Sequence, residues 1–215
     1  MNKTFNYIMK KYNLRLGKDF YLEIPDMGRD DLGTLFKELN FNEGAEVGVE
    51  RGLYSEVLCK ANPNLHLWCI DPWSKDAYIP GISGVDQEQE GFEICYREAI
   101  NRLKPYNCTF VREYSMDAIK SFDDESLDFV YIDANHDFVN FTRDIDGWKN
   151  KVKMGGIIAG HDYAYFSYKK FNHVKRVIES YTRCYRMRPY FVIGSMEYNG
   201  LKRDKYRSWM WVKDH

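Results

Sequence analysis

The chain has 215 residues, of which 44% are hydrophobic and 29% are charged, and its formal net charge is −1 at pH 7. This length and composition predict one globular domain with a substantial core. A balanced charge provides no overall field for holding a polyanion, so we expect no nucleic-acid partner.

Five cysteines are scattered without any C-x-x-C pair, which is typical of reduced thiols. The first 24 residues contain no apolar stretch long enough for a signal peptide, and no window approaches the roughly 18 to 20 apolar residues of a membrane span. We therefore expect a cytoplasmic protein without a membrane partner. The sequence leaves the oligomeric state open.

Residues 1–42 are expected to form a helical N-terminal lead-in to a main domain that covers residues 43–215, within a single domain overall. The stretch "DDLGTLFKEL" (30–39) predicts a helix with Asp30 as its cap. The sequence does not indicate what this lead-in does.

Short apolar runs then alternate with helical patterns. Continuous apolar runs are typical of strands buried on both faces. The segments between them have apolar residues three and four positions apart, which is typical of amphipathic helices. The alternation predicts an α/β fold with a doubly wound, mostly parallel sheet. The predicted strands cover residues 44–49, 65–71, 108–113, 127–133 and 155–162.

The end of the chain predicts a helix over residues 169–182 and two more strands, "YFVIGS" (190–195) and "SWMWVKD" (208–214). A turn at Asn199-Gly200, or the charged loop after it, would join them into a final antiparallel strand pair. The sheet is then seven-stranded. The loop at 72–86 has the length of a lid or binding loop.

The stretch "AEVGVERGLYSEVL" (45–58) runs from a strand through Gly48 and Gly52 into a helix. A glycine lets the backbone approach a ligand, and free amides at a helix start favour polar or anionic groups. A dinucleotide site needs a glycine where Glu50 stands. A tight turn without a ligand is the alternative, but Glu46 inside the strand then lacks the partner that a buried carboxylate needs.

Polar residues follow the second and third predicted strands. Asp71 lies about twenty residues past the glycine turn, where a carboxylate can accept hydrogen bonds from ribose hydroxyls, or where it caps the turn "DPW". Ser115, Met116 and Asp117 lie where an adenine ring would be expected. Ser115 is equally compatible with the N-cap of the next helix.

Asp133 and Asp162 end the fourth and fifth predicted strands. Because parallel strands bring their carboxyl ends to one edge of a sheet, we expect these side chains to be neighbours. Two carboxylates repel each other unless a cation or a proton lies between them, and oxygen ligands suit Mg²⁺. His161 can bind a divalent ion, although imidazole suits Zn²⁺ better.

His136 lies three residues past Asp133, in the loop over the predicted site. A histidine with a pKa near neutrality can take a proton from a hydroxyl, so His136 is a candidate general base. The alternatives are a contact with substrate or a cap for the helix beginning near Phe138. We predict that Asp137 caps that helix.

Five segments together resemble the class I S-adenosylmethionine-dependent methyltransferases: "EVGVERG", the strand-end Asp71, "SMDAI", "SLDFVYIDANHDF" and "DIDGWKNKVKMGGIIAGHDY". More narrowly, they resemble the macrocin-type and other natural-product sugar O-methyltransferases, where I-D-x-x-H and G-G-x-x-x-x-H-D recur. The resemblance covers about residues 43–165 and implies a Rossmann-like methyltransferase fold.

The resemblance also implies site residues. Glu46 and Gly48 match the acidic-x-Gly turn beside the methionine moiety, whereas Glu50 departs from the wider E-x-G-x-G-x-G form. The implied S-adenosylmethionine ligands are Glu46, Gly48, Glu50, Gly52, Asp71, Ser115, Met116 and Asp133. The implied divalent-metal ligands are Asp133, His161 and Asp162, with His136 and Asp133 as the catalytic pair.

The implied activity is methyl transfer from S-adenosylmethionine to a hydroxyl of a small molecule such as a sugar or polyhydroxylated metabolite, assisted by Mg²⁺ or another divalent ion. Aligning nucleophile, methyl carbon and sulfur supplies most of such catalysis. The candidates for stacking on a sugar face are Trp73, Tyr78, Tyr163, Tyr165 and Phe166. The alternatives are an NAD-dependent oxidoreductase and a non-catalytic module for nucleoside binding or interaction.

Overall fold

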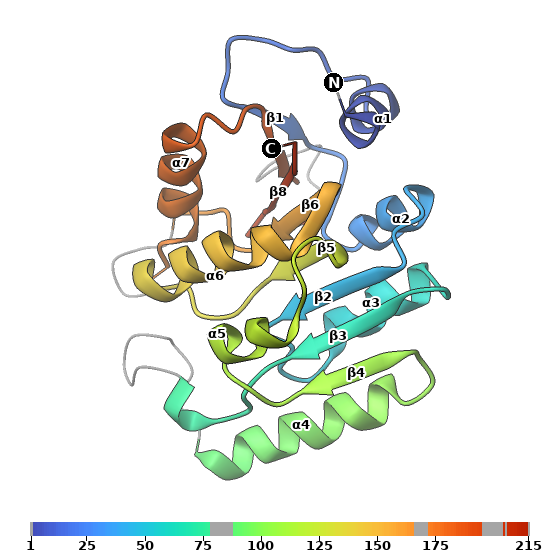
Figure 1. Cartoon of the computed structure of the whole chain (residues 1–215), viewed down its shortest axis with the longest axis vertical. Helices are drawn as coiled ribbons and strands as arrows, with labels where there is room; N and C mark the ends of the chain where they lie inside the picture. Colours follow the sequence, from blue (N-terminus) through green and yellow to red (C-terminus); the bar gives the residue numbers. More distant parts are fainter. Residues whose placement is uncertain (1, 78–87, 166–171, 195–203, 205, 215) are drawn as a thin grey trace.

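The structure is a computed structural model that describes residues 2–77, 88–165, 172–194, 204 and 206–214. Its strands form one eight-stranded sheet in the order β1-β7-β8-β6-β5-β2-β3-β4 (Figure 1). The strands are β1 (Tyr21–Ile24), β2 (Glu43–Val47), β3 (His66–Ile70), β4 (Cys108–Val111), β5 (Leu127–Ile132), β6 (Val152–Gly160), β7 (Tyr190–Ile193) and β8 (Ser208–Val212).

The doubly wound, mostly parallel sheet is confirmed. β8 runs antiparallel to both β6 and β7, which gives the expected antiparallel pair, and the other pairings are parallel. The predicted count of seven strands is wrong. The eighth strand, β1, lies in the N-terminal lead-in and pairs with β7 from Tyr21 opposite Tyr190 to Ile24 opposite Ile193. This four-residue edge strand is half-exposed, so it has no continuous apolar run to reveal it.

Helices cover both faces of the sheet. α2, α3 and α4 pack on the face that carries Phe129 and Tyr131, and α5, α6 and α7 pack on the face that carries Val130 and Ile132. The helices are α1 (Lys3–Lys11), α2 (Asp31–Glu38), α3 (Leu53–Ala61), α4 (Gln89–Leu103), α5 (Ser115–Ala118), α6 (Phe138–Lys151) and α7 (Val174–Cys184), with short 3₁₀ turns η1 (Lys75–Ala77) and η2 (Ile119–Ser121).

Close packing explains a glycine in the strand below the predicted turn. The ring of Phe129 stacks on that of Phe36 from α2, with centroids 4.0 Å apart. A Cβ at Gly44 would lie 2.2 Å from the Phe129 ring, so the neighbouring strand needs a residue without a side chain there. This packing fixes β2 against β5 below the edge where their loops meet.

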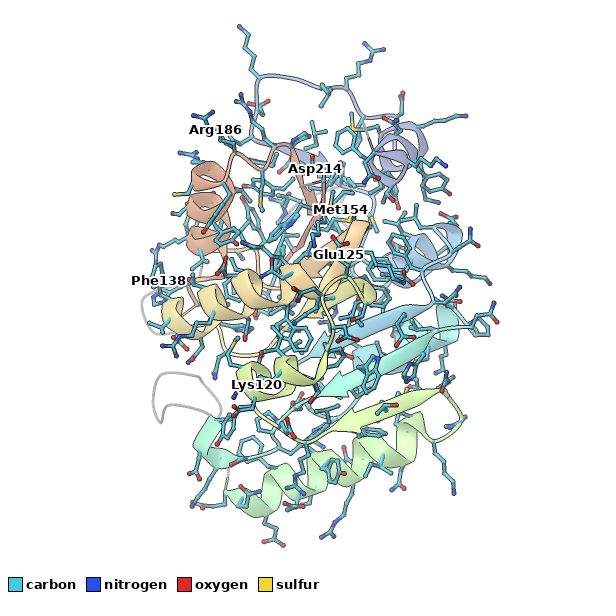
Figure 2. The ribbon with its side chains drawn as sticks, in the orientation of Figure 1. Lys120, Glu125, Phe138, Met154, Arg186 and Asp214 are labelled. Carbon is cyan, nitrogen blue, oxygen red and sulfur yellow. The ribbon has the colours of Figure 1, made fainter. Side chains whose placement is uncertain are left out.

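The helix predictions differ from the structure mainly at the ends. Asp30 precedes α2, but its side chain makes no capping hydrogen bond. Asp137 caps α6, as predicted, by accepting from the amides of Val139 and Asn140. Phe138, the first residue of α6, is 57% exposed at the outer end of the helix (Figure 2). The predicted turn at 199–200 lies outside the described residues, as does most of the loop at 72–86. Among the described residues, no helix has the length and apolar character needed to cross a membrane.

Candidate functional site

Backbone hydrogen bonds connect the carboxyl ends of three parallel strands, β3, β2 and β5. The amide of Gly48 after β2 donates to the Ile70 carbonyl of β3 over 2.9 Å. The amide of Asp133 after β5 donates to the Val47 carbonyl over 2.8 Å. The loops that carry the predicted site residues therefore lie side by side at one edge of the sheet.

The glycine turn after β2 has the left-handed backbone that its sequence suggests. Gly48 has a φ of 94°, and Gly52, the N-cap of α3, has a φ of 70°. A Cβ at Gly48 would lie 2.3 Å from the carbonyl oxygen of Asp133. Gly48 is thus required for contact between the loops after β2 and β5. Glu50 also has a positive φ, and its side chain points to solvent.

Asp71 supports this turn from the end of β3. Its Oδ2 accepts from the amides of Val49 at 3.0 Å and Glu50 at 2.9 Å, and its Oδ1 accepts from the amide of Trp73 at 2.7 Å. Burial raises the pKa of Asp71, and the three backbone donors oppose that rise. Asp71 therefore organises the turn itself, which includes the capping role that the sequence suggested.

A pocket of about 190 Å³ lies beside the turn. Gly48, Asp71, Ser115 and Met116, all predicted cofactor ligands, line it. The remaining wall is formed by Val47, Ile70, Pro72, Ala77, Tyr114, Ala134, Asn135, Asn140, Arg143 and Asp144. Glu46, Glu50, Gly52 and Asp133, which the resemblance also implied, do not line this pocket.

Glu46 has the buried partner that its position requires. Its side chain is in β2, is almost completely buried, and accepts a hydrogen bond from the hydroxyl of Ser55 in α3. Burial raises the pKa of Glu46 to about 8. The carboxyl is therefore mainly protonated at neutral pH, and it links the strand below the turn to the helix after it.

Asp144 is a pocket residue that the sequence analysis missed. It is 3% exposed, and its Oδ1 accepts a hydrogen bond from the Ser115 hydroxyl over 2.5 Å. Ser115 in turn accepts from Nε1 of Trp148 over 2.8 Å, and the N-cap of α5 is Tyr114 instead of Ser115. A signal was present, because Asp144 lies in the apolar stripe of α6, next to Ile145 and one turn from Trp148.

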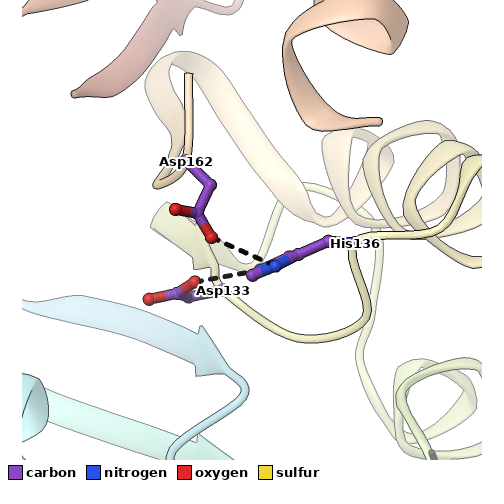
Figure 3. A group of neighbouring side chains, drawn as sticks. All are labelled: Asp133, His136 and Asp162. Carbon is purple, nitrogen blue, oxygen red and sulfur yellow. Dashed lines mark hydrogen bonds and ion pairs between the residues drawn. The ribbon is translucent and has the colours of Figure 1, made fainter. Parts of the chain in front are cut away.

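Beside the pocket, Asp133, His136 and Asp162 meet at the ends of β5 and β6. One potential metal-binding atom from each residue lies within 4.8 Å of the others. His136 lies between the two carboxylates, with Nε2 3.2 Å from Asp133 and Nδ1 3.1 Å from Asp162 (Figure 3). His161 is also adjacent, with Nδ1 3.8 Å from Asp133 and 3.6 Å from Asp162. The fold thus brings together every residue predicted for this edge.

The charges in this cluster stabilise one another. Burial acts to raise the pKa of Asp133, but the hydrogen bond with His136 and the charge of His161 outweigh it, so the pKa is lowered. Burial acts to lower the pKa of His136, but Asp133 and Asp162 outweigh it, so the pKa is raised. For Asp162, burial dominates and the pKa is raised.

Two further residues reach the cluster from outside the central sheet. Nε2 of His161 lies 3.0 Å from Oδ1 of Asp204, whose Oδ2 accepts from Ser208 over 2.7 Å. Nη1 of Arg29 lies 3.6 Å from Oδ2 of Asp133. Neither residue was predicted, because nothing in a single sequence indicates that these two distant segments approach β5 and β6.

The predicted stacking of aromatic residues on a sugar is wrong for two of them. Trp73 is fully buried against Tyr96, with ring centroids 4.7 Å apart, and its Nε1 donates to the Glu50 carbonyl. Tyr163 is 1% exposed and shares a hydrogen bond with Tyr190. Both side chains belong to the core.

The family of this chain follows from a match over residues 45–163 to the family described as a methyltransferase domain. The match covers more than half of the chain, so the chain belongs to this family. Together with the sheet order and the glycine turn, it makes the protein a member of the class I S-adenosylmethionine-dependent methyltransferases, as the sequence motifs suggested. Family membership does not support the alternative of an NAD-dependent oxidoreductase. Among curated proteins, no match is found.

Solved structures of distant sequence share the fold. The O-methyltransferase TomG from Streptomyces achromogenes, in complex with SAM, is 13% identical with a TM-score of 0.57, over 99% of this chain and 91% of that chain. The N-methyltransferase NodS from Bradyrhizobium japonicum is 14% identical with a TM-score of 0.55, over 87% and 95%. An rRNA methylase from Streptococcus thermophilus is 11% identical with a TM-score of 0.54, over 86% and 94%. The fold is thus shared by methyltransferases with different acceptors.

Proposed function

We propose that this protein transfers the methyl group of S-adenosylmethionine to a hydroxyl of a small molecule with neighbouring hydroxyls, such as a sugar or another polyhydroxylated metabolite, with the help of a divalent cation. The observation that carries the proposal is the cluster of Asp133, His136 and Asp162 beside the pocket. A net charge of −1 favours a small acceptor over a nucleic acid.

The cluster fits a divalent cation. Ligands at about 2.0 to 2.6 Å from one ion are at most about 5 Å apart, and the candidate ligand atoms lie within 4.8 Å of one another. Asp133 and Asp162 supply the oxygen atoms that suit Mg²⁺, and His161, whose Nδ1 lies 3.8 Å from Asp133 and 3.6 Å from Asp162, supplies a nitrogen. A bound cation lowers the pKa of a hydroxyl that coordinates it.

The pocket fits the adenosyl part of the cofactor. Asp71 uses Oδ1 for a single backbone donor, so this oxygen keeps a lone pair for a ribose hydroxyl. Ser115 and Met116 lie on the same wall. We assign the methionine end to the glycine turn, next to the loop that carries Asp133, because the reacting methyl group must lie close to the acceptor.

His136 is the proposed base. Its ring lies between Asp133 and Asp162, which orient it and stabilise its protonated form. In the neutral form, one ring nitrogen would accept the proton of the acceptor hydroxyl as the oxygen attacks the methyl carbon, the carbon–sulfur bond breaks and S-adenosylhomocysteine leaves. Asp133 stabilises the imidazolium that results. Methyl transfer is direct, so the residues that remain serve to bind and align the two substrates.

The test combines binding and activity. Calorimetry with S-adenosylhomocysteine should give binding at micromolar concentrations, and Mn²⁺ or Mg²⁺ should bind with an affinity that D133N and D162N reduce. Acceptor screening with and without EDTA, scored by S-adenosylhomocysteine release, should identify diols whose methylation requires the cation. If S-adenosylhomocysteine binds but no cation binds, the part of the proposal that concerns the metal is wrong. Cofactor binding without turnover of any hydroxyl acceptor would favour the non-catalytic module.

A further inference from the structure

The pocket contains a buried carboxylate with an unused oxygen. Asp144 lines the pocket together with Ser115 and Met116, and it is 3% exposed. Its Oδ1 accepts from Ser115. Its Oδ2 has no hydrogen-bond partner among the residues that the structure describes. A buried carboxylate with one free oxygen is costly unless water or a ligand completes its hydrogen bonds.

The other polar groups of the wall are less suited to be that acceptor. Asp71 is held by three backbone donors, and Arg143 has only donor groups. Asn135 and Asn140 are half-buried and donate to Ala77 and Asp137. Asp144 thus combines burial, charge and a free acceptor in this wall.

The acid expected beside the adenine ring from the resemblance does not occupy this position. Asp117, in "SMDAI", has a side chain that is 59% exposed and paired with Lys120 over 2.6 Å. It does not line the pocket. The carboxylate on this side of the pocket comes instead from α6.

We infer that Asp144 recognises the adenine ring of S-adenosylmethionine by accepting a hydrogen bond from its exocyclic amine through Oδ2. The inference rests on the proposed function, because it assumes that the pocket holds the adenosyl group. An amine donates to the carboxylate, whereas the oxygen that replaces it in hypoxanthine is repelled. A buried site built for an N–H group discriminates strongly against an analogue that lacks it.

The test compares two ligands that differ at this edge of the ring, because hypoxanthine has an oxygen in place of the exocyclic amine and a proton on N1. Calorimetry at pH 8.5, where Asp144 is ionised because burial raises its pKa only to about 7, should measure S-adenosylhomocysteine and S-inosylhomocysteine. The wild type should prefer the adenine ligand by about tenfold or more. D144N, whose amide can turn its N–H₂ towards the oxygen, should lower the preference to about threefold or less. S115A is the matched control, because it removes the bond to Oδ1 and leaves Oδ2; it should keep the preference.

Each outcome either supports or overturns the proposed role of Asp144 in binding the adenine ring. Equal affinity of the wild type for both ligands, or an unchanged preference in D144N, would overturn it while leaving the proposed function intact. If neither ligand binds the wild type, the proposed function fails as well. Asp144→Ser, with a smaller side chain, provides a second variant if circular dichroism shows that D144N does not fold, and it should also lose the preference.

Discussion

The glycine turn and the acidic cluster of Asp133, His136 and Asp162 lie at the same edge of the sheet. The carboxylates at these two places have different kinds of partner. Asp71 is held by three amides of the main chain, which are fixed by the fold. Asp133 and Asp162 are held by the side chains of His136 and His161, which can lose a proton or rotate. The turn is therefore complete without a ligand, whereas the proposed function requires the cluster to exchange its present partners for a cation.

The largest effect is expected when the carboxylate of Asp71, which accepts hydrogen bonds from the amides of the turn, is removed. D71A should lower the free energy of unfolding by on the order of 3 to 5 kcal/mol, because buried backbone donors lose their acceptor. It should also abolish binding of S-adenosylhomocysteine. Urea denaturation and calorimetry provide the measurements. A variant within 1 kcal/mol of wild type that still binds would mean that the turn is organised by other contacts.

The second prediction concerns Glu46 beneath the turn. Its pKa rises from 4.5 to about 8 on burial, so unfolding releases a proton within this range and the wild type loses stability as pH increases through it. E46Q keeps the bond from Ser55 and cannot titrate. Relative to wild type, it should gain up to about 1.4 kcal/mol per pH unit in this window.

Urea denaturation at pH 5 and pH 8 measures this gain. E50Q, which changes an exposed carboxyl of the following loop, is the control and should keep the wild-type pH dependence. The same pH dependence in E46Q and wild type would show that Glu46 is ionised in the folded protein.

In the acidic cluster, D162N should weaken cation binding without lowering the stability of the fold. Burial raises the pKa of Asp162, so the folded protein gains little from its charge, and asparagine tolerates the positive φ of 61° at this position. We expect Mn²⁺ affinity to fall by about 100-fold while the free energy of unfolding changes by less than about 1 kcal/mol. A large loss of stability would contradict the distinction between the cluster and the turn.

A smaller effect is expected for Asp204, which we regard as a positioning residue for His161. Its carboxylate holds Nε2 and leaves Nδ1 directed towards Asp133 and Asp162. D204N should weaken cation binding by about 10-fold to 100-fold and leave the affinity for S-adenosylhomocysteine within twofold. S208A retains the carboxylate and should bind the cation like the wild type. Unchanged cation affinity in D204N would show that His161 is not a ligand.

The smallest expected effect is at Asp137, one residue from His136. D137A removes the cap of α6 and should cost about 1 kcal/mol of stability. Cation affinity should not change, because Asp137 belongs to the helix and not to the cluster. Thermal unfolding with parallel Mn²⁺ titration measures both effects; a loss of cation binding would assign Asp137 to the site.

The parts of the fold that depend on residues close together in the sequence could be predicted. Buried parallel strands are continuous apolar runs, and the strand ends place Asp71, Asp133 and Asp162 at one edge. β1 was missed because its pairing with β7 depends on a partner far along the chain. Arg29 and Asp204 were missed for the same reason. Asp144 was available in the apolar stripe of α6, but its role depends on the pocket that only the three-dimensional structure provides.

The contact between Asp204 and His161 has a consequence for the order in which parts of the protein can fold during synthesis. Residues 45–163 match the family model, but the contact that orients His161 comes from Asp204, 43 residues after this histidine. A ribosome must therefore have synthesised the chain through Asp204 before this contact can fix the histidine in place. The glycine turn can form before Asp204 is synthesised, whereas the cluster of Asp133, His136 and Asp162 gains the contact between Asp204 and His161 only afterwards.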